Sequence, residues 1–352
     1  MKEGKVNQQY LADQLGLSVT TVSRCFTNHP KIKPGTRAKV LQLATELGYS
    51  YNAFRNQKNP LKVDNRTVAV LVGVSPDNAD AAGVAGKIFA GISQKAAALD
   101  FQVKIYYVNP SEFVPNMNSR RIIPNSTDNN LAGIILVFPF REETVKALSS
   151  RFHVTSVLDE YEELFIDSIN PDDGRGIACM VRKLKDLGHR KFGFFSWFYP
   201  DVDTPWVERR MGSYFEHLYR YGLEFDQDRI IRIDSAEAQS TTNAADLVIE
   251  HVEKGMTALV CAADHQAYEL IVALKEKGVR VPEDLSITGY DGIPVPIGMS
   301  PLTTYNSHFH EIGVSGMISI QRRIDHPLAN RRHVLVDGDM IEGTTTAIPK
   351  NL

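Results

Sequence analysis

Residues 11–24 read Leu11-Ala12-Asp13-Gln14-Leu15-Gly16-Leu17-Ser18-Val19-Thr20-Thr21-Val22-Ser23-Arg24. The apolar spacing before Gly16 predicts a short helix over residues 6–14, with Tyr10, Leu11 and Gln14 directed inward. This helix is expected to end near Gly16, because glycine adopts the left-handed turn conformation without a steric penalty. A tight turn therefore follows the first helix.

A second helix is expected to begin at Ser18, whose hydroxyl is a good N-cap, and to run to about Thr27. Val22 and Phe26 lie four residues apart and share one face of that helix. The other side of the helix carries Val19, Thr20, Ser23 and Arg24. One face thus anchors the helix, and a mainly polar face points outward.

Pro34 fits the first turn of a third helix, which continues through Val40, Leu43 and Leu47 and ends at Gly48. Two helices joined by a glycine turn are typical of the helix-turn-helix, whose second helix enters the DNA major groove. A small helical bundle with no DNA-binding role has the same pattern, so both interpretations remain open on periodicity alone.

The charge of the chain is divided unevenly along its length. The 352 residues carry a formal net charge of -3. Residues 1–62 contain ten Lys and Arg against three acidic residues, a charge of +7, which leaves -10 on the remainder. A basic unit of this size on an acidic body is suited to binding a polyanion, because neutralising phosphates drives affinity for nucleic acid.

Composition and cysteine use favour a reduced globular protein of more than one domain. Apolar residues make up 43% and charged residues 23% of the sequence, which is typical of folded soluble proteins. Cys25, Cys179 and Cys261 are far apart and odd in number, which argues against a disulfide framework or a zinc site. The sequence shows no export signal or membrane-spanning run, so we expect a cytoplasmic protein that does not enter a membrane.

Beyond Thr67, β-rich apolar runs alternate with helical periods, which predicts α/β architecture with parallel, Rossmann-like sheets. This stretch exceeds what one core comfortably holds, so two lobes with a cleft between them are expected. The expected division is a helical head at 1–50, a linker at 51–65, and a body at 66–352 whose first lobe comprises 66–165 and 295–325 and whose second comprises 166–294 and 326–352.

The sequence lacks the common motifs for catalysis and cofactor binding. Gly86-Lys87 would need Gly at 81 and Ser or Thr at 88 to form a phosphate loop, and Ala81 and Ile88 stand there. The histidines do not have the spacing of a metalloprotease site, and the nucleophile elbow of hydrolases is missing. We therefore expect no enzymatic activity, no cofactor and no metal.

The head resembles the lactose/galactose repressor family of transcriptional regulators. The resemblance is carried by Leu11-Ala12-x-x-Leu15-Gly16-Leu17-Ser18-x-x-Thr21-Val22-Ser23-Arg24 and by Gly48-Tyr49-x-x-Asn52. It implies that Val19, Thr20 and Arg24 read bases, since arginine bonds guanine bidentately and Val19 offers only apolar contact. It further implies contacts at phosphates or groove edges from Ser18, Thr21, Ser23, Asn28 and His29. Tyr49 and Asn52 are also expected to bind DNA. For His29, an exposed loop position without DNA contact is an equal alternative.

The linker departs from the family pattern. Relatives place a leucine wedge where Lys58 stands, and lysine neutralises phosphate but does not unstack base pairs. Phe54 is the large apolar residue nearby and is the candidate wedge. A plain flexible tether through Pro60 is the alternative.

The body also matches the family, whose effector domain resembles periplasmic sugar-binding proteins. The matching segments are Asp172-Asp173-x-x-Gly176, Leu187-Gly188-His189-Arg190-Lys191, Arg209-x-x-Gly212, Cys261-Ala262-Ala263-Asp264-x-x-Ala267 and Val281-Pro282-Glu283-Asp284-Leu285-Ser286-Ile287-x-Gly289-Tyr290-Asp291. The resemblance implies effector contacts by Arg209, Asp264 and Asp291, because arginine donates and aspartate accepts hydrogen bonds from polyhydroxylated ligands.

Alternatives to ligand contact remain for the two aspartates. Asp264 also suits the N-terminus of a helix, and Asp291 suits a turn before a glycine. We add Trp206, from an aromatic cluster, as a surface on which a ring could stack, and Asp77 from the segment after the first strand. That segment lacks the Asn-Pro-aromatic run usual in the family, so the wall it forms is not defined.

These observations predict a ligand-responsive, sequence-specific DNA-binding regulator, a repressor that senses a sugar or sugar derivative. Its expected partners are a double-stranded DNA operator, a small-molecule effector and a second copy in a homodimer on a pseudo-palindromic site. Sensing of a purine or another small metabolite is the alternative within the same class. A sugar-binding protein with no regulatory role is the rival from another class.

Overall fold

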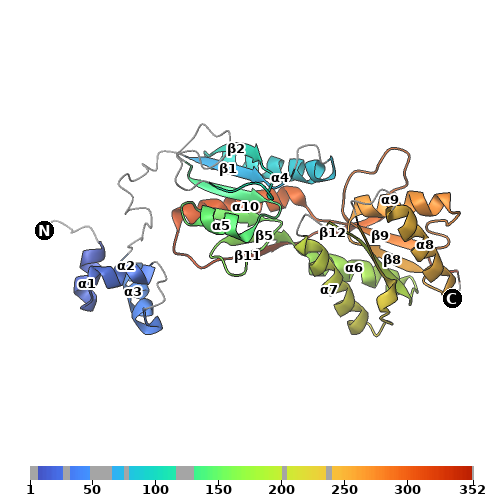
Figure 1. Cartoon of the computed structure of the whole chain (residues 1–352), viewed down its shortest axis with the longest axis horizontal. Helices are drawn as coiled ribbons and strands as arrows, with labels where there is room; N and C mark the ends of the chain where they lie inside the picture. Colours follow the sequence, from blue (N-terminus) through green and yellow to red (C-terminus); the bar gives the residue numbers. More distant parts are fainter. Residues whose placement is uncertain are drawn as a thin grey trace.

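A computed structural model describes residues 7–26, 32–47, 66–74, 79–115, 131–199, 204–234 and 240–350 of the chain (Figure 1). The described residues form a helical head and a body with two β-sheets. Asn28, His29, Tyr49, Asn52, Phe54 and Asp77, to which the sequence assigned roles, lie outside the described residues.

The head contains three helices: α1 (Gln8–Leu15), α2 (Val19–Phe26) and α3 (Pro34–Glu46). Gly16 has φ +63° and ends α1, as expected for a left-handed turn residue. The backbone N–H of Thr21 donates to the Ser18 side-chain oxygen at 3.1 Å, which confirms the predicted N-cap. The core of the head consists of Leu11, Ala12, Val22, Cys25, Val40 and Ala44.

Two side chains of α1 lie on the opposite side from the one predicted. Tyr10 is 42% exposed and Gln14 is exposed, although both were expected to face inward. The inward face is formed by Leu11 and Ala12, with Leu15 packed beside them. Leu11 and Leu15 are four residues apart, so the buried stripe lies about one residue further along the helix than the sequence pattern suggested.

The first lobe is built on a sheet with strand order β11-β5-β4-β3-β1-β2, in which all pairs are parallel. Its strands are β1 (Thr67–Val72), β2 (Gln102–Tyr107), β3 (Gly133–Val137), β4 (Val154–Val157), β5 (Asp167–Pro171) and β11 (His333–Val336). Its helices are α4 (Ala79–Ala98), α5 (Glu142–Ser149) and α10 (Phe309–Asp325). Strand β1 is buried along its whole length, as a central parallel strand must be.

The second lobe has strand order β12-β10-β9-β8-β6-β7, with only the β10–β12 pair antiparallel. Its strands are β6 (Phe192–Phe198), β7 (Ile230–Asp234), β8 (Ala258–Cys261), β9 (Ser286–Asp291), β10 (Thr303–Asn306) and β12 (Asp339–Ile341). Its helices are α6 (Asp173–Asp186), α7 (Pro205–Arg220), α8 (Ser240–Glu253) and α9 (Asp264–Glu276), with a 3-10 turn, η2, at Gln227–Arg229. The two parallel-sheet lobes confirm the predicted fold class.

The lobe boundaries differ from those expected at three strands. Strand β5 pairs with β4 and β11 pairs with β5 in the first sheet, although both segments were assigned to the second lobe. Strand β10 pairs with β9 in the second sheet, although it was assigned to the first lobe. A hydrophobic run predicts that a strand exists, but its hydrogen-bond partner depends on contacts far away in the sequence. In the described residues, the chain therefore passes between lobes after β5, β10 and β11.

Helices α4 and α10 pack closely on one face of the first sheet (Figure 1). Two glycines allow this approach. A Cβ at Gly91 would lie 2.0 Å from the His310 carbonyl oxygen, and one at Gly313 would lie 2.1 Å from that of Ile88. Both glycines are therefore required by the packing of these two helices.

None of the helices that the structure describes is long and apolar enough to cross a membrane. Within the same residues, no group of three or more His, Cys, Asp or Glu side chains is placed to hold a metal ion.

Candidate functional site

Helix α2 presents one buried and one exposed face. Val22 and Cys25 are buried against α1 and α3, while Ser18, Thr20 and Arg24 are exposed and Val19 is 36% exposed. Thr20 and Arg24 are four residues apart and therefore lie on the same face of the helix. Thr21 and Ser23 are partly buried beside them. The exposed face of α2 therefore contains Val19, Thr20 and Arg24, the residues that the family resemblance assigns to base reading.

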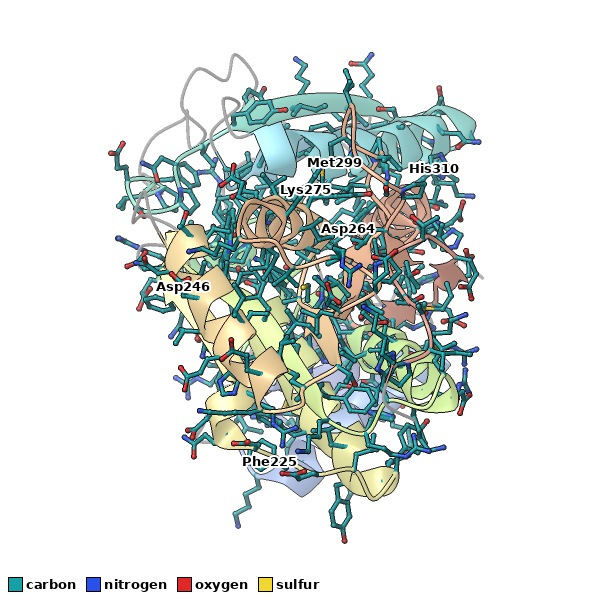
Figure 2. All side chains as sticks on the ribbon, turned by 90° about the vertical axis from the view of Figure 1, so that its right-hand side faces the viewer. Phe225, Asp246, Asp264, Lys275, Met299 and His310 are labelled. Atoms are coloured by element: carbon teal, nitrogen blue, oxygen red, sulfur yellow. The ribbon has the colours of Figure 1, made fainter. Side chains whose placement is uncertain are left out.

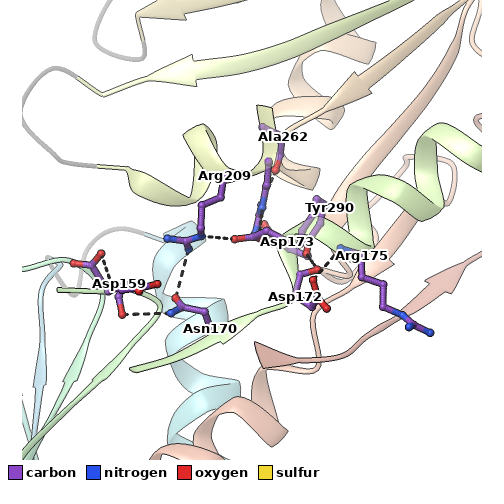
Figure 3. Close-up of polar contacts among 11 residues, drawn as sticks. Asp159, Asn170, Asp172, Asp173, Arg175, Arg209, Ala262 and Tyr290 are labelled. Carbon is purple, nitrogen blue, oxygen red and sulfur yellow. Dashed lines mark hydrogen bonds and ion pairs between the residues drawn. The ribbon is translucent and has the colours of Figure 1, made fainter. Parts of the chain in front are cut away.

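In the body, polar side chains converge where the parallel strands end. Asn170 lies in β5, Asp291 ends β9, and Asp173 and Asp264 begin α6 and α9. Helix α7 adds Trp206, Arg209 and Arg210. Of the effector residues predicted from sequence, Arg209 bonds Asp173 (Figure 3). Asp291 bonds Arg210, which also bonds Asp173 and contacts the Trp206 ring. Asp264 interacts electrostatically with Asp291. The carboxyl ends of strands are where ligands gather in open α/β folds.

Arg209 connects the two lobes. Its Nε donates to Asp173 Oδ2 at 2.9 Å, and its Nη2 donates to Asn170 Oδ1 at 3.4 Å (Figure 3). Asn170 belongs to the first sheet, and its amide nitrogen is 3.4 Å from the Asp159 carbonyl oxygen. The Arg209 side chain remains 31% exposed, so part of its guanidinium is open to solvent. It can therefore offer donors to a ligand without breaking its existing bonds.

Arg210 was not singled out from the sequence and lies at the centre of the network. Its Nε donates to Asp173 Oδ1 at 2.8 Å, its Nη1 to the Ala262 carbonyl oxygen at 2.6 Å, and its Nη2 to Asp291 Oδ1 at 3.1 Å. A signal was present in the sequence: Arg210 follows the buried Val207 by three residues, so it had to face the core. A buried guanidinium requires acidic partners, and Asp173 is one of them. The sequence placed Asp173 in a family motif but gave no sign that it pairs with Arg210.

Asp264 is almost completely buried at the first position of α9. Its carboxylate accepts from the Thr304 hydroxyl at 2.6 Å and from the backbone N–H of Ile293 at 2.9 Å. Burial, together with the nearby charge of Asp291, raises the pKa of Asp264 to about 7. Figure 2 shows Asp264 in the interior of the view, away from the peripheral Phe225 and Asp246. The position also matches the alternative interpretation of a charge at a helix N-terminus.

Asp291 has φ +114°, a backbone conformation that side-chain-bearing residues rarely adopt. It lies directly before Gly292, which has φ +65°, so the turn described as its alternative role is present. Burial raises the pKa of Asp291 to about 6, although the Arg210 guanidinium acts in the opposite direction. Strain and burial at one carboxylate are typical of a functional position.

Trp206 is partly buried, and the Arg210 guanidinium lies 4.8 Å from its ring centroid. The sequence predicted it as a stacking surface for a ligand. The Trp206 ring therefore already has one cation partner within the protein, Arg210.

Two comparisons with family models match separate parts of the chain. A model of bacterial regulatory proteins of the lacI family matches residues 11–52, and a model of the periplasmic binding protein-like domain matches residues 181–346. The HTH-type transcriptional repressor CytR of Escherichia coli strain K12 is 26% identical over 341 residues, which cover 95% of this chain and 94% of CytR.

Solved structures share the fold over nearly the whole chain. A complex of the transcriptional regulator CelR with cellobiose has a TM-score of 0.65 at 19% identity, covering 97% of this chain and 100% of that one. The lac repressor dimer bound to operator and an anti-inducer has a TM-score of 0.63 at 20% identity, covering 97% of this chain and 99% of that one.

Proposed function

The chain belongs to the lacI family of bacterial regulatory proteins, and from that premise we propose that it is a repressor whose affinity for an operator is controlled by a sugar or sugar derivative. It is a DNA-binding, ligand-responsive transcriptional regulator rather than an enzyme. One observation carries the proposal furthest: α2 is anchored by Val22 and exposes Val19, Thr20 and Arg24, within a segment, residues 1–62, that has a charge of +7.

In this proposal α2 lies in the major groove. Arg24 bonds the O6 and N7 of a guanine, Thr20 offers a hydroxyl and a methyl group, and Val19 contacts a thymine methyl. Ser18, Thr21 and Ser23 lie near phosphates or groove edges, as do Asn28 and His29. Tyr49 and Asn52 are proposed as further DNA-binding residues. Phe54 is proposed as a wedge in the minor groove, with a flexible tether as the alternative.

The effector is proposed to bind where the network joins the lobes. The Arg209 side chain is partly exposed and can donate to a ligand, and Asp291, which pairs with the neighbouring Arg210, supplies a carboxylate acceptor. Three cations (Lys87, Arg209 and Arg210) lie among three carboxylates (Asp173, Asp264 and Asp291), which suits an uncharged polyhydroxylated ligand better than a highly charged one. Asp264 and Asp77 are proposed as further contacts.

A purine or another small metabolite is the second candidate. The observation that favours it is the Trp206 ring, since aromatic rings stack on planar bases as well as on sugar faces. We further propose a homodimer whose two heads read half-sites about one helical turn apart. The lac repressor, whose structure is similar, is a dimer bound to its operator.

The test starts from DNA fragments recovered by genome-wide footprinting of the bound protein. Fluorescence anisotropy then measures affinity for these fragments with and without cellobiose, ribose and guanine as probes. We expect a sugar to change the affinity, and Arg209→Met to remove this response while DNA binding without ligand stays. Arg232→Met is the matched control, because Arg232 pairs with Glu208 on the same helix as Arg209. A response to guanine alone would replace the sugar proposal by the purine one.

A further inference from the structure

We propose that Arg210 is the positioning residue of the effector site: it holds Asp173 and Asp291 in place, and through Asp173 it holds Arg209, without touching the effector itself. The inference rests on the proposed function of that site. It assigns a role to a residue whose side chain is only 4% exposed and which therefore has no surface left for a ligand.

The guanidinium of Arg210 joins three segments that are distant in the sequence. Its nitrogens bond Asp173 at the start of α6, the carbonyl of Ala262 after β8, and Asp291 at the end of β9. A planar fork with donors in several directions can satisfy these three acceptors together, whereas a lysine ammonium has a single charged centre. Arg210 thus fixes the relative positions of two strand ends and one helix start.

Asp173 transmits this arrangement to Arg209. One carboxylate oxygen accepts from Arg210 at 2.8 Å, and the other accepts from Arg209 at 2.9 Å. The Asp173 side chain is 3% exposed, so it has little freedom to turn towards one partner alone. Whatever orients Asp173 therefore also orients the partly exposed Arg209.

Aromatic rings hold the guanidinium itself. The Arg210 guanidinium carbon lies 3.6 Å from the Tyr290 ring centroid and 4.8 Å from that of Trp206. The Tyr290 hydroxyl donates to the Asp172 carbonyl oxygen at 3.2 Å, which ties this ring to the start of α6 (Figure 3). Contacts of a cation with two ring faces stabilise its position. Arg210 therefore contacts the two carboxylates of the site, Asp173 and Asp291, as well as the proposed stacking residue Trp206.

Arg210 also favours the charged form of Asp291. Burial favours the protonated carboxyl, and the positive charge of Arg210 opposes this effect. Without Arg210, Asp291 would take up a proton at a higher pH and would lose part of its capacity as an acceptor. Loss of Arg210 should therefore raise the pKa of Asp291, whereas loss of a residue that only stabilises the fold should not.

The experiment measures the titration of Asp291 in the full chain. Aspartate 13Cγ resonances are followed against pH in wild type, Arg210→Gln and Arg210→Lys, with Asp291→Asn to assign the signal. We expect the Asp291 midpoint to rise by about one pH unit or more in Arg210→Gln and by less in Arg210→Lys. In both variants the Nε hydrogen of Arg209 should exchange with solvent faster than in wild type.

Arg229→Gln is the matched control, because Arg229 is equally buried and pairs with Glu224 and Asp226 in the same lobe. It should lower thermal stability and leave Asp291 and Arg209 unchanged. If Arg210→Gln fails to fold, Arg210→Lys decides through the Arg209 exchange rate. An unchanged Asp291 midpoint with an unchanged Arg209 exchange rate would overturn the proposal. Titration with cellobiose is recorded separately, so a wild type that does not bind it contradicts the choice of effector and not the role of Arg210.

Discussion

The Lys87 ammonium donates a hydrogen bond to the Gly292 carbonyl oxygen at 3.0 Å. Lys87 lies on α4 of the first lobe, and Gly292 follows β9 of the second, directly after Asp291. This bond therefore joins the two lobes beside the candidate effector site. A single substitution at Lys87 would remove this polar contact between the lobes.

Lys87→Met should loosen the contact between the lobes. A hydrogen bond from a charged donor contributes roughly 1.5 to 3 kcal/mol when buried, and a partly exposed one less. We expect a larger radius of gyration in small-angle X-ray scattering, with the two lobes still folded by circular dichroism. Lys275→Met, at an exposed position on α9, should leave the scattering curve as in wild type. Identical curves for Lys87→Met and wild type would show that this bond does not hold the lobes together.

Asp264 should make folding stability depend on pH. Its pKa is about 7 in the folded protein against an ordinary value of 3.8, so the folded state holds a proton that the unfolded state has lost. The stabilisation is therefore complete at low pH and declines as pH rises from about 4 to about 7. Asp291, with a pKa of about 6, acts in the same direction. Each group contributes a slope of at most about 1.4 kcal/mol per pH unit.

Asp264→Asn should remove its share of that slope. Urea unfolding of wild type and variant between pH 5 and pH 7.5 measures the difference, and subtraction eliminates the contribution of other groups. Asp284→Asn is the control, because hydrogen bonds from Arg280 and Lys350 lower the pKa of Asp284 and its effect therefore falls below this range. Parallel stability curves for wild type and Asp264→Asn would contradict a raised pKa at Asp264.

Gly91→Ala should destabilise the first lobe strongly. The added Cβ would lie 2.0 Å from the His310 carbonyl oxygen, so α4 would have to move away from α10. Overpacking of this kind costs typically 1 to 3 kcal/mol, and a clash with backbone lies at the upper end, about 3 kcal/mol. Gly86→Ala is the matched control on the same helix, because its Cβ would have no atom within 4 Å. It should stabilise by up to about 1 kcal/mol in urea unfolding, and equal effects of the two changes would refute the packing argument.

Ser18→Ala should weaken the start of α2. The Ser18 oxygen accepts from the Thr21 N–H at 3.1 Å, and loss of such a cap costs about 1 kcal/mol. Hydrogen exchange of the α2 amides should accelerate roughly fivefold. Ser18→Gly should cost only a few tenths of a kcal/mol, and Ser18→Asp should retain the cap. If all three variants exchange alike, the cap does not stabilise the helix.

The sequence predicted the local elements well and the long-range arrangement less well. Gly16, Ser18 and Val22 follow short-range rules of turns, caps and helix faces, so the head could be read residue by residue. The sheet to which β5, β10 and β11 belong depends on strand pairing between distant segments, which no local pattern encodes. Tyr10 was misplaced because a shift of one residue turns the buried stripe of a helix by about 100°, enough to move Tyr10 out of it.

The candidate site was predicted only in part, because its residues are also brought together by contacts between distant segments. Arg209, Asp264 and Asp291 were identified through motifs that resemble a family, and the structure brings their segments together. Arg210 and Asn170 were missed, because a buried polar side chain is recognised by its partners, and these lie on other segments of the chain. An arginine three residues after a buried valine was the one signal available.

The most direct test of the account is the affinity of wild type and Arg24→Ala for a recovered operator fragment, measured by fluorescence anisotropy over a series of salt concentrations. For wild type, we predict that the logarithm of the affinity falls linearly with the logarithm of the salt concentration, since the basic head displaces counterions. Arg24→Ala should bind roughly 5- to 150-fold more weakly, with relaxed preference at one base pair. Salt-independent or absent binding by wild type, or equal affinities of the two proteins, would contradict a DNA-reading role for α2.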